Sequence, residues 1–286
     1  MINKEYKSFF KTVSGNEGNK CHYPTRLDSY GCGCTNNCSY CYAKSLLSFR
    51  KLWDPQNPAV ADIGKVIKTI EKHLNSGDIV RLGGMTDCFQ PLEKTARITY
   101  QVIEELNKRD IGYLIVTKCH LVAEDDYVKI MRRDLAHIQI SITSTDDDFS
   151  KQYEHTSSPS ERIRAIEKLQ REGFDVQVRL SPFIPQFIGQ GHLDLDTISN
   201  IECDKILIEF LRVNSWIKKW FSIDYDEYTV KENGYLHMPL ETKLRYISMI
   251  KGFKEISVCE DESHAYEYWK TQFNKNPEDC CNLRIE

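Results

Sequence analysis

Short apolar runs alternate with helical periods along most of the chain, and this alternation restricts the fold more than any other feature. The runs are continuous in Ile, Val and Leu, as in strands buried on both faces; they cover residues 79–84, 113–117, 138–143, 176–180, 205–210 and 256–259. Between them, apolar residues recur every three or four positions, as in 60–74, 92–106, 163–169 and 240–250. The alternation predicts right-handed βαβ units and a mostly parallel sheet.

The number of these units limits the architecture further. A strand near residues 26–30 brings the count to about six strand–helix units in a chain of 286 residues, which is long enough for one large domain or two small ones. Six units build either a full or partial barrel or an open, doubly wound sheet. The expected fold class is therefore α/β, and periodicity alone does not choose between these forms.

Composition excludes several classes of protein. Hydrophobic residues make up 41% of the chain and charged residues 28%, which excludes a disordered or collagen-like chain. The net charge of −4 argues against a uniformly basic wrapper of nucleic acid. No apolar run approaches the roughly 18 residues of a membrane span, and residues 1–11 lack the apolar stretch of a signal peptide. We expect a cytoplasmic protein with no membrane partner.

One stretch departs from the alternation and is rich in aromatic residues. Residues 211–238 contain Trp216, Trp220, Phe221, Tyr225, Tyr228 and Tyr235, with Lys218 and Lys219 between them. A connection of this length is often a lid or a binding loop. The alternative is a local cluster of side chains that covers the sheet.

The strongest local signal is a group of closely spaced cysteines. Cys34, Cys38 and Cys41 follow the spacing C-x3-C-x2-C, within a chain whose eleven cysteines and missing secretory signal favour metal or thiol chemistry over disulfides. Three such thiolates converge on one soft metal centre. A three-cysteine set leaves one iron of a four-iron cluster open to a substrate or cofactor. The alternative is a zinc site completed by a distant His or Cys.

This motif, with Tyr40 just before its last cysteine, resembles the signature of the radical S-adenosylmethionine (SAM) superfamily. The resemblance implies that Cys34, Cys38 and Cys41 bind a 4Fe–4S cluster whose open iron chelates SAM. One electron, from a donor such as flavodoxin or ferredoxin, then cleaves SAM to methionine and a 5′-deoxyadenosyl radical. The implied fold is a partial (β/α)6 TIM-like barrel, with the cluster loop after the first strand.

Further motifs resemble the spore photoproduct lyase-like branch of that superfamily. They are GGMTDCFQPLE at 83–93, Thr117-Lys118, Ser141-Ile142-Thr143, Glu154 with SPSER at 158–162, Leu169 with Gly173, and RLSPFIP at 179–185. The resemblance therefore covers about residues 28–190. It divides the chain into an N-terminal segment (1–24), a radical SAM barrel core (25–212), and the aromatic loop with a C-terminal extension (213–286), packed on the same domain.

The resemblance also assigns SAM contacts, each with a simpler alternative. Tyr40 would lie against the adenine or only pack the loop. Thr86 and Asp87 would hold the SAM ammonium or only cap the next helix. Lys118 would meet the SAM carboxylate or only point to solvent. The two remaining contacts lie on later strands: Ser141 would bond the ribose, and Arg179 would reach a carboxylate, either of SAM or of Glu154.

Two thiols are candidate catalytic residues, Cys88 and Cys119. Spore photoproduct lyases carry a hydrogen-donating cysteine in the second-strand motif, and aligned on Thr86 and Asp87 this chain has Met85 at that place. Met85 has no S–H to give. Cys88 or Cys119 is then the substitute, or each is a buried structural thiol. For Cys280 and Cys281 there are three alternatives: they reach the active site, they bind a second cluster, or they only pack in the core. No compact motif indicates a second cluster.

Four functions follow for comparison. The first is radical SAM chemistry on a nucleic-acid or nucleotide substrate, and the second is the same chemistry on a peptide or small metabolite. The third is an iron–sulfur electron carrier or sensor, and the fourth is a structural zinc domain. The candidate SAM contacts at three strand ends argue against the last two, because neither role needs them.

Overall fold

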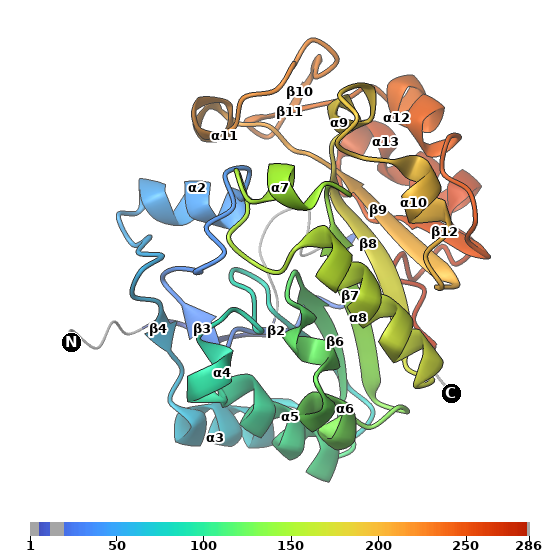
Figure 1. Ribbon diagram of the computed structural model, residues 1–286. Coiled ribbons are helices and arrows are strands. Elements are labelled where there is room, and N and C mark those ends of the chain that lie inside the picture. The colour runs from blue at the N-terminus through green and yellow to red at the C-terminus, as the bar shows by residue number, and fades with distance from the viewer. Residues whose placement is uncertain (1–5, 12–19, 285–286) are drawn as a thin grey trace.

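The chain folds around one mostly parallel sheet (Figure 1). The computed structural model describes residues 6–11 and 20–284, and within them eight strands form a sheet of order β1-β2-β5-β6-β7-β8-β9-β12. They are β1 (Phe9–Phe10), β2 (Arg26–Leu27), β5 (Ile79–Leu82), β6 (Gly112–Thr117), β7 (Ala136–Ile142), β8 (Asp175–Phe183), β9 (Lys205–Phe210) and β12 (Glu255–Val258). Strand β1 runs antiparallel to β2, and the other neighbouring strands are parallel.

The sheet curves without closing. Its edge strands, β1 and β12, are not paired with each other in the described part of the chain. Right-handed connections place helices on one face, where α5 contacts β6, and α8 contacts β7 and β8. The predicted α/β fold with a partial TIM-like barrel is confirmed. Every strand predicted from 79 to 259 is present with bounds shifted by a few residues, because continuous Ile, Val and Leu runs suit strands between two buried layers.

The remaining elements are short. Two small antiparallel pairs stand apart from the main sheet: β3 (Tyr30–Gly31) with β4 (Ala59–Val60), and β10 (Val230–Glu232) with β11 (Tyr235–His237). The helices are α2 (Tyr42–Phe49), α3 (Ile63–His73), α4 (Glu93–Ala96), α5 (Ile98–Lys108), α6 (Asp125–Ile130), α7 (Asp147–Ser150), α8 (Pro159–Arg171), α9 (Gln186–Gly189), α10 (Leu195–Ser199), α11 (Ser215–Trp220), α12 (Leu240–Ile247) and α13 (Ser263–Tyr268), with single turns at His120–Ala123 and Trp269–Phe273.

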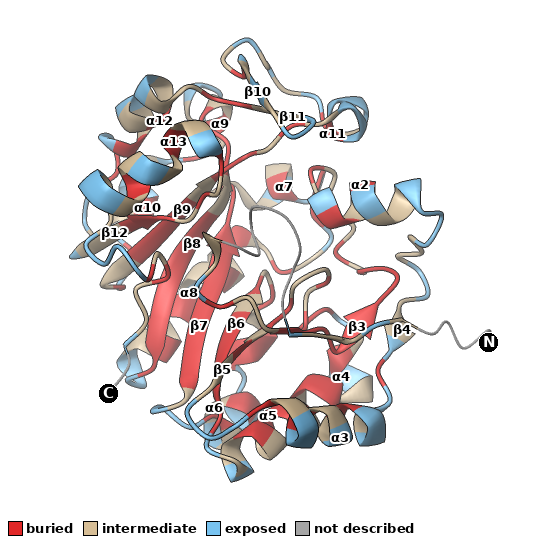
Figure 2. Ribbon diagram, turned by 180° about the vertical axis from the view of Figure 1, so that it is seen from behind, coloured by how far each residue is buried: buried red, intermediate tan, exposed pale blue. Residues whose placement is uncertain are grey.

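The two faces of the sheet differ in polarity. On β7, Ile138, Ile140 and Ile142 are fully buried and point to the helical layer, and the residues between them, Gln139 and Ser141, point the other way. Strand residues alternate between the two faces, and residues paired in the register lie on the same face. The division into an apolar and a polar face therefore continues from β7 to its neighbour β8. Figure 2 views β6, β7 and β8 from the inner side. The apolar core therefore lies outside the curve, and the polar face lines its inside.

One predicted helix is divided in two. The period over 92–106 becomes α4 and α5, separated by Arg97 with φ 51°. The buried carboxylate of Glu93 accepts hydrogen bonds from the backbone N–H groups of Thr99 (3.0 Å) and Tyr100 (2.9 Å). It satisfies two donors at the start of α5, which a continuous helix would have paired internally. The break follows from this cap.

The aromatic stretch is structured rather than one long loop. It forms α11 and the β10–β11 hairpin, which Val213 and Leu236 tie together through an isolated bridge. The Phe221 ring packs on the ring of Tyr40 (centroids 5.5 Å apart), so the stretch closes over the cysteine loop. The C-terminal extension returns beyond this hairpin and adds β12 to the main sheet. Within the described residues, no helix has the length and apolarity to cross a bilayer.

Candidate active site

A cavity of about 1510 Å³ opens on the inner side of the sheet at the carboxyl ends of its strands. Active sites of barrel enzymes lie at this end because loops after successive strands meet there. All nine residues that the sequence proposed for the cluster and for SAM line this cavity: Cys34, Cys38, Tyr40, Cys41, Thr86, Asp87, Lys118, Ser141 and Arg179. The tertiary structure thus brings together residues from five separate segments.

The cysteine loop runs from β3 into α2. Cys41 is the N-cap residue of α2, and its sulfur accepts a hydrogen bond from the backbone N–H of Lys44 at 3.5 Å. Burial raises the pKa of all three thiols, that of Cys34 to about 12. Because iron binds the thiolate, loading of this loop releases protons. The N-terminal end of α2 also favours negative charge on Cys41.

The donor set of the loop suits an iron–sulfur cluster. The three thiols line one cavity, and each lies close enough to affect the pKa of another. Thiolates are the ligands of such clusters, and a cubane holds each sulfur on a separate iron. Among residues 6–11 and 20–284, no three His, Cys, Asp or Glu side chains are already gathered around a metal position.

The loop after β5 is held by a buried carboxylate. Asp28 accepts hydrogen bonds from the backbone N–H groups of Gly84 (2.7 Å) and Met85 (3.0 Å), with Thr86 N at 3.4 Å. Burial raises the pKa of Asp28, and these N–H donors oppose the rise. Gly83 makes the turn with φ 84°, where a side chain would be strained. The N–H groups of residues 84–86 are thus satisfied by Asp28, and the carbonyl of Gly84 accepts from the Tyr42 hydroxyl at 2.6 Å.

Asp87 joins three parts of the site. Its Oδ2 accepts from the amide of Asn36 (3.0 Å) in the cysteine loop and from the backbone N–H of Lys118 (2.8 Å) after β6. Its Oδ1 accepts from Thr117 Oγ1 (2.7 Å) and Phe89 N (2.9 Å). The hydroxyl of Thr86 donates to the carbonyl of Tyr30 at 2.7 Å. Both residues therefore position the site, and their oxygens are already engaged within the protein.

The end of the GGMTDCFQPLE motif is a scaffold. Gln90 Oε1 accepts from the backbone N–H (2.9 Å) and hydroxyl (3.3 Å) of Thr35, which fixes the cysteine loop. Glu93 accepts from the hydroxyl of Tyr127 at 2.5 Å and from that of Tyr30, besides capping α5. These contacts explain why the motif extends beyond the residues that face the cavity.

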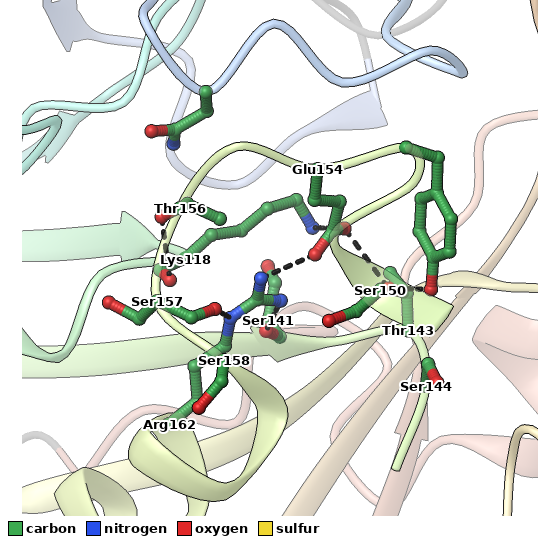
Figure 3. Close-up of polar contacts among 12 residues, drawn as sticks. Lys118, Ser141, Thr143, Ser144, Ser150, Glu154, Thr156, Ser157, Ser158 and Arg162 are labelled. Atoms are coloured by element: carbon green, nitrogen blue, oxygen red, sulfur yellow. Dashed lines mark hydrogen bonds and ion pairs between the residues drawn. The ribbon is translucent and has the colours of Figure 1, made fainter. Parts of the chain in front are cut away.

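A buried ion network supports Lys118 (Figure 3). Glu154 lies between Lys118 (Nζ to Oε1 3.5 Å) and Arg162 of α8, and Thr143 Oγ1 donates to it at 3.0 Å. Lys118 Nζ also donates to the carbonyl of Ser181 at 3.0 Å. Burial lowers the pKa of Lys118 to about 8. An anion in the cavity would favour its charged form.

Arg179 and Ser141 lie side by side on β8 and β7, where the register pairs them. Arg179 donates to Glu209 of β9 (2.5 Å) and to Gln139 Oε1 (2.6 Å). The alternative that Arg179 pairs with Glu154 is therefore wrong, because Arg162 occupies that carboxylate. Glu209 compensates the charge that burial would otherwise make costly.

Tyr40 provides a test of whether a cofactor fits here. Its ring is buried among the rings of Tyr153 and Phe221, with Lys118 Nζ 5.4 Å from its centroid. Its hydroxyl is buried without a hydrogen-bond partner in the described structure. An unpaired buried hydroxyl is costly, and Tyr40 is among the residues that line the cavity. A polar ligand in the cavity would supply the partner, as SAM can.

The two candidate catalytic thiols lie elsewhere. Cys88 is fully buried and Cys119 nearly so, and neither is among the residues that line the cavity. Cys119 Sγ accepts from Ser157 Oγ at 3.5 Å. Burial raises the pKa of both thiols. The expectation that one of them meets a substrate has no support in this arrangement, whereas Met85 does line the cavity.

Sequence reasoning missed Asp28, Arg162 and Glu209 as site residues. Asp28 follows β2 directly, and Glu209 is the polar residue near the end of β9. A polar residue at the carboxyl end of a buried strand predicts a site residue, and this pattern would have identified both. Arg162 is not at a strand end but closes the SPSER motif named beside Glu154, and it reaches the site through the packing of α8 on β7.

Comparisons with known proteins agree with this architecture. An uncharacterized protein of Methanocaldococcus jannaschii is 26% identical over 165 residues, 56% of this chain and 61% of that protein. The match thus spans about three fifths of the relative's length. A spore photoproduct lyase variant superposes with a TM-score of 0.61 at 18% identity, covering 82% of this chain and 76% of that chain.

A second structure, spore photoproduct lyase complexed with dinucleoside spore photoproduct, gives a TM-score of 0.59 at 16% identity, covering 80% of this chain and 72% of that chain. At such identity the likeness shows the fold alone. The family model of the radical SAM superfamily matches residues 29–198, which include the three loop cysteines and the strand ends of the site. The chain therefore belongs to the radical SAM superfamily of enzymes, which bind SAM and an iron–sulfur cluster.

Proposed function

We propose that this enzyme holds a 4Fe–4S cluster on Cys34, Cys38 and Cys41, which, when reduced, cleaves SAM to methionine and a 5′-deoxyadenosyl radical that abstracts hydrogen from an organic substrate. One observation carries the proposal: these thiols share a single cavity with Tyr40, Lys118, the loop after β5 and the inner residues of β7 and β8.

The residues of the cavity divide the binding of SAM among them. Lys118, held by Glu154, presents a cation to the SAM carboxylate. The backbone carbonyls of Met85 and Thr86, whose N–H groups face Asp28, accept from the SAM ammonium. Tyr40 places its ring and unpaired hydroxyl against the nucleoside, and Ser141 lies within reach of the ribose.

The surrounding aromatic rings exclude water. Tyr40, Tyr153 and Phe221 contact one another with centroids 5.5 to 5.8 Å apart. Of the three rings only Tyr40 lines the cavity, and Phe221, which follows α11, packs behind it. A dry wall protects a reactive radical from side reactions.

The first substrate class that we propose is a nucleic acid or nucleotide. It rests on the branch resemblance, and one neighbour in fold is complexed with a dinucleoside. Exposed side chains of Tyr42, Leu46 and Leu52 line the cavity together with Trp53, and the two aromatic rings would stack on bases.

The second class is a peptide or small metabolite, and the charge of the opposite wall favours it. Carboxylates of Glu232, Asp261, Glu262 and Glu278 line that part of the cavity. Close carboxylates repel phosphate groups. Their charge is partly offset by partners: Arg212 for Asp261 (2.6 Å), Lys243 and His237 for Glu262, His264 for Glu232 and Lys270 for Glu278. An amine-bearing substrate matches this wall better than a polyanion does.

The test is formation of 5′-deoxyadenosine by anaerobically reconstituted protein with SAM and dithionite. We expect product from the wild type and none from Cys38→Ala. The matched control is Cys203→Ala, because Cys203 is also buried but lies outside the cavity and donates to the carbonyl of Val176. An iron-loaded wild type that leaves SAM intact would refute the proposal.

Two additions to this assay separate the substrate classes. Ultraviolet-irradiated DNA should raise 5′-deoxyadenosine if the substrate is a nucleic acid, and the binding should weaken steeply with salt, because phosphate contacts release counterions. Slow product unaffected by DNA favours a peptide or metabolite. Replacing dithionite with reduced flavodoxin or ferredoxin tests the proposed electron donor.

A further inference from the structure

Four cysteines that the proposed function leaves unused come together inside the barrel. Cys281 is buried against Tyr23, and Cys21, Cys259 and Cys280 pack against the same small cluster. The Cys259 side chain interacts with those of Cys280 and Cys281, and also lies near Cys21. The four come from an N-terminal segment, the end of β12 and the C-terminal segment, so they form no compact sequence motif.

Three of these four cysteines line the cavity that holds the candidate SAM site, and Cys281 is buried behind them. Cys21, Cys259 and Cys280 line it, on the wall formed by β12 and the C-terminal segment. The register of β9 with β12 places Cys259 next to Glu209, the partner of Arg179. The second group of cysteines therefore shares the cavity with Cys34, Cys38 and Cys41 but approaches it from another wall.

The C-terminal segment that carries two of them is firmly anchored. Gln177 Nε2 donates to the carbonyl of Cys281 at 2.5 Å, and Lys205 Nζ donates to the next carbonyl, of Asn282, at 2.7 Å. The carboxylate of Asp279 accepts from Tyr23 OH (2.8 Å) and from the backbone N–H of Cys281 (2.9 Å). Buried side chains of the sheet thus fix the backbone on which Cys280 and Cys281 stand.

The charge around the four cysteines suits a thiolate centre. Arg26, Arg81 and Arg179 line the same cavity from β2, β5 and β8. Arg81 and Arg179 lie near Cys259, and Arg26 and Arg81 lie near Cys21. A cluster held by four thiolates carries net negative charge, and such buried charge needs nearby cations.

We propose that Cys21, Cys259, Cys280 and Cys281 bind a second iron–sulfur cluster, which shares the cavity with the SAM site. Thiolates are the ligands of such clusters. All four cysteines are free thiols in the structure. Among the described residues, neither these side chains nor the three cysteines of the family motif are already gathered around a metal position.

The two centres would differ in chemistry. Three cysteines leave an iron open for SAM, whereas four fill every corner and leave none. The second cluster would therefore carry electrons next to the substrate and bind neither SAM nor substrate. This inference does not require the proposed SAM chemistry to be right, since iron is measured independently of SAM cleavage.

The test compares iron and sulfide in full-length variants after anaerobic reconstitution. We expect about eight iron atoms per wild-type chain, as for two four-iron clusters. The variant Cys34→Ala/Cys38→Ala/Cys41→Ala should keep about half of this iron and lose SAM cleavage. The variant Cys259→Ala/Cys280→Ala/Cys281→Ala should also keep about half, and a variant combining all six changes should keep none. Cys203→Ala, with its buried thiol outside the cavity, should keep all of it.

Spectroscopy decides the nature of the second centre. The variant without the loop cysteines should show the Mössbauer and reduced-state electron paramagnetic resonance signals of a 4Fe–4S cluster. If that variant binds no iron, or binds one zinc ion instead, the proposal is wrong. If it does not fold, by circular dichroism and gel filtration, the wild type and the Cys259 variant decide: about four iron atoms in each would overturn the proposal.

Discussion

At the scale of single residues, the site shows two kinds of side chain. Some face the cavity with unused capacity, such as the Tyr40 hydroxyl. Others, such as Asp28 and Asp87, accept hydrogen bonds from backbone N–H groups of neighbouring loops. We expect the first kind to contact ligands, whereas the second kind fixes the loops around the cavity. Their substitution should therefore affect different measurements.

Tyr40→Phe tests the first kind. Removing a hydroxyl that has no protein partner should leave the ligand-free protein as stable as before or more so, and should weaken SAM binding by about five- to tenfold, the worth of one hydrogen bond. The measurements are urea unfolding and equilibrium dialysis with SAM. Tyr153→Phe is the matched control: its hydroxyl lies 3.2 Å from Thr143 Oγ1, so its loss should lower stability. Unchanged SAM affinity in Tyr40→Phe would contradict the assignment.

Asp87→Asn tests the second kind. An amide offers one acceptor oxygen in place of two, so the contacts to Asn36 and Thr117 cannot both persist. We expect a loss of about 2 kcal/mol in the free energy of unfolding, together with a lower iron content. Asp148→Asn, at an exposed surface pair with Lys151, should cost less than about 0.5 kcal/mol. Equal stability of the two variants would show that Asp87 does not join the loops.

At the scale of elements, helix α8 acts on a site that it does not line. A capping box at Ser158 and Glu161 fixes its first turn. The packing of α8 on β7 and β8 then delivers Arg162 to Glu154, and Glu154 in turn holds Lys118. A helix on the outer face thereby sets the position of a cation on the inner face.

The substitution Arg162→Met tests whether Arg162 positions Lys118 through Glu154. It leaves Glu154 as a buried carboxylate with only Lys118 and Thr143 beside it, and burial already raises its pKa. We expect a loss of about 3 kcal/mol in unfolding free energy and weaker SAM binding. The matched control, Arg164→Met, changes an exposed arginine on the same helix and should alter neither. Chemical denaturation and SAM titration measure both effects.

At the scale of the whole molecule, the end of the chain closes back on the sheet. Asp175, at the start of β8, contacts His137 of β7 (2.7 Å), Lys205 of β9 (2.8 Å) and the backbone N–H of Arg284 (2.8 Å). One carboxylate thus joins three strands and the C-terminal segment. These partners outweigh burial and hold the pKa of Asp175 at about 2, below its ordinary value.

Stability should therefore depend on pH through Asp175. The depressed pKa adds about 2 kcal/mol above about pH 4, and this contribution is lost as the pH falls through about 2. The gap in unfolding free energy between wild type and Asp175→Asn should accordingly narrow from about pH 6 to about pH 3. Asp226→Asn, at an exposed carboxylate, should show no such narrowing. A gap independent of pH in urea denaturation would contradict the assignment to this carboxylate.

The sequence by itself determined the main parallel strands, but not the antiparallel β1 or the two small pairs. Period and composition are local properties, and the motifs shared with the family assigned Lys118, Ser141 and Arg179 at strand ends, which barrel topology brings together. Thiol spacing likewise identified Cys34, Cys38 and Cys41, because ligands close in sequence are close in space.

Tertiary structure alone decided which polar groups are already paired and which distant residues meet. In the structure Arg179 pairs with Glu209 instead of Glu154, and Cys88 is buried in the core. Cys21, Cys259, Cys280 and Cys281 pack in one cluster. These outcomes depend on contacts between residues far apart in the chain. No local pattern encodes such contacts, since they form only when the C-terminal segment folds back against the inner face of the sheet.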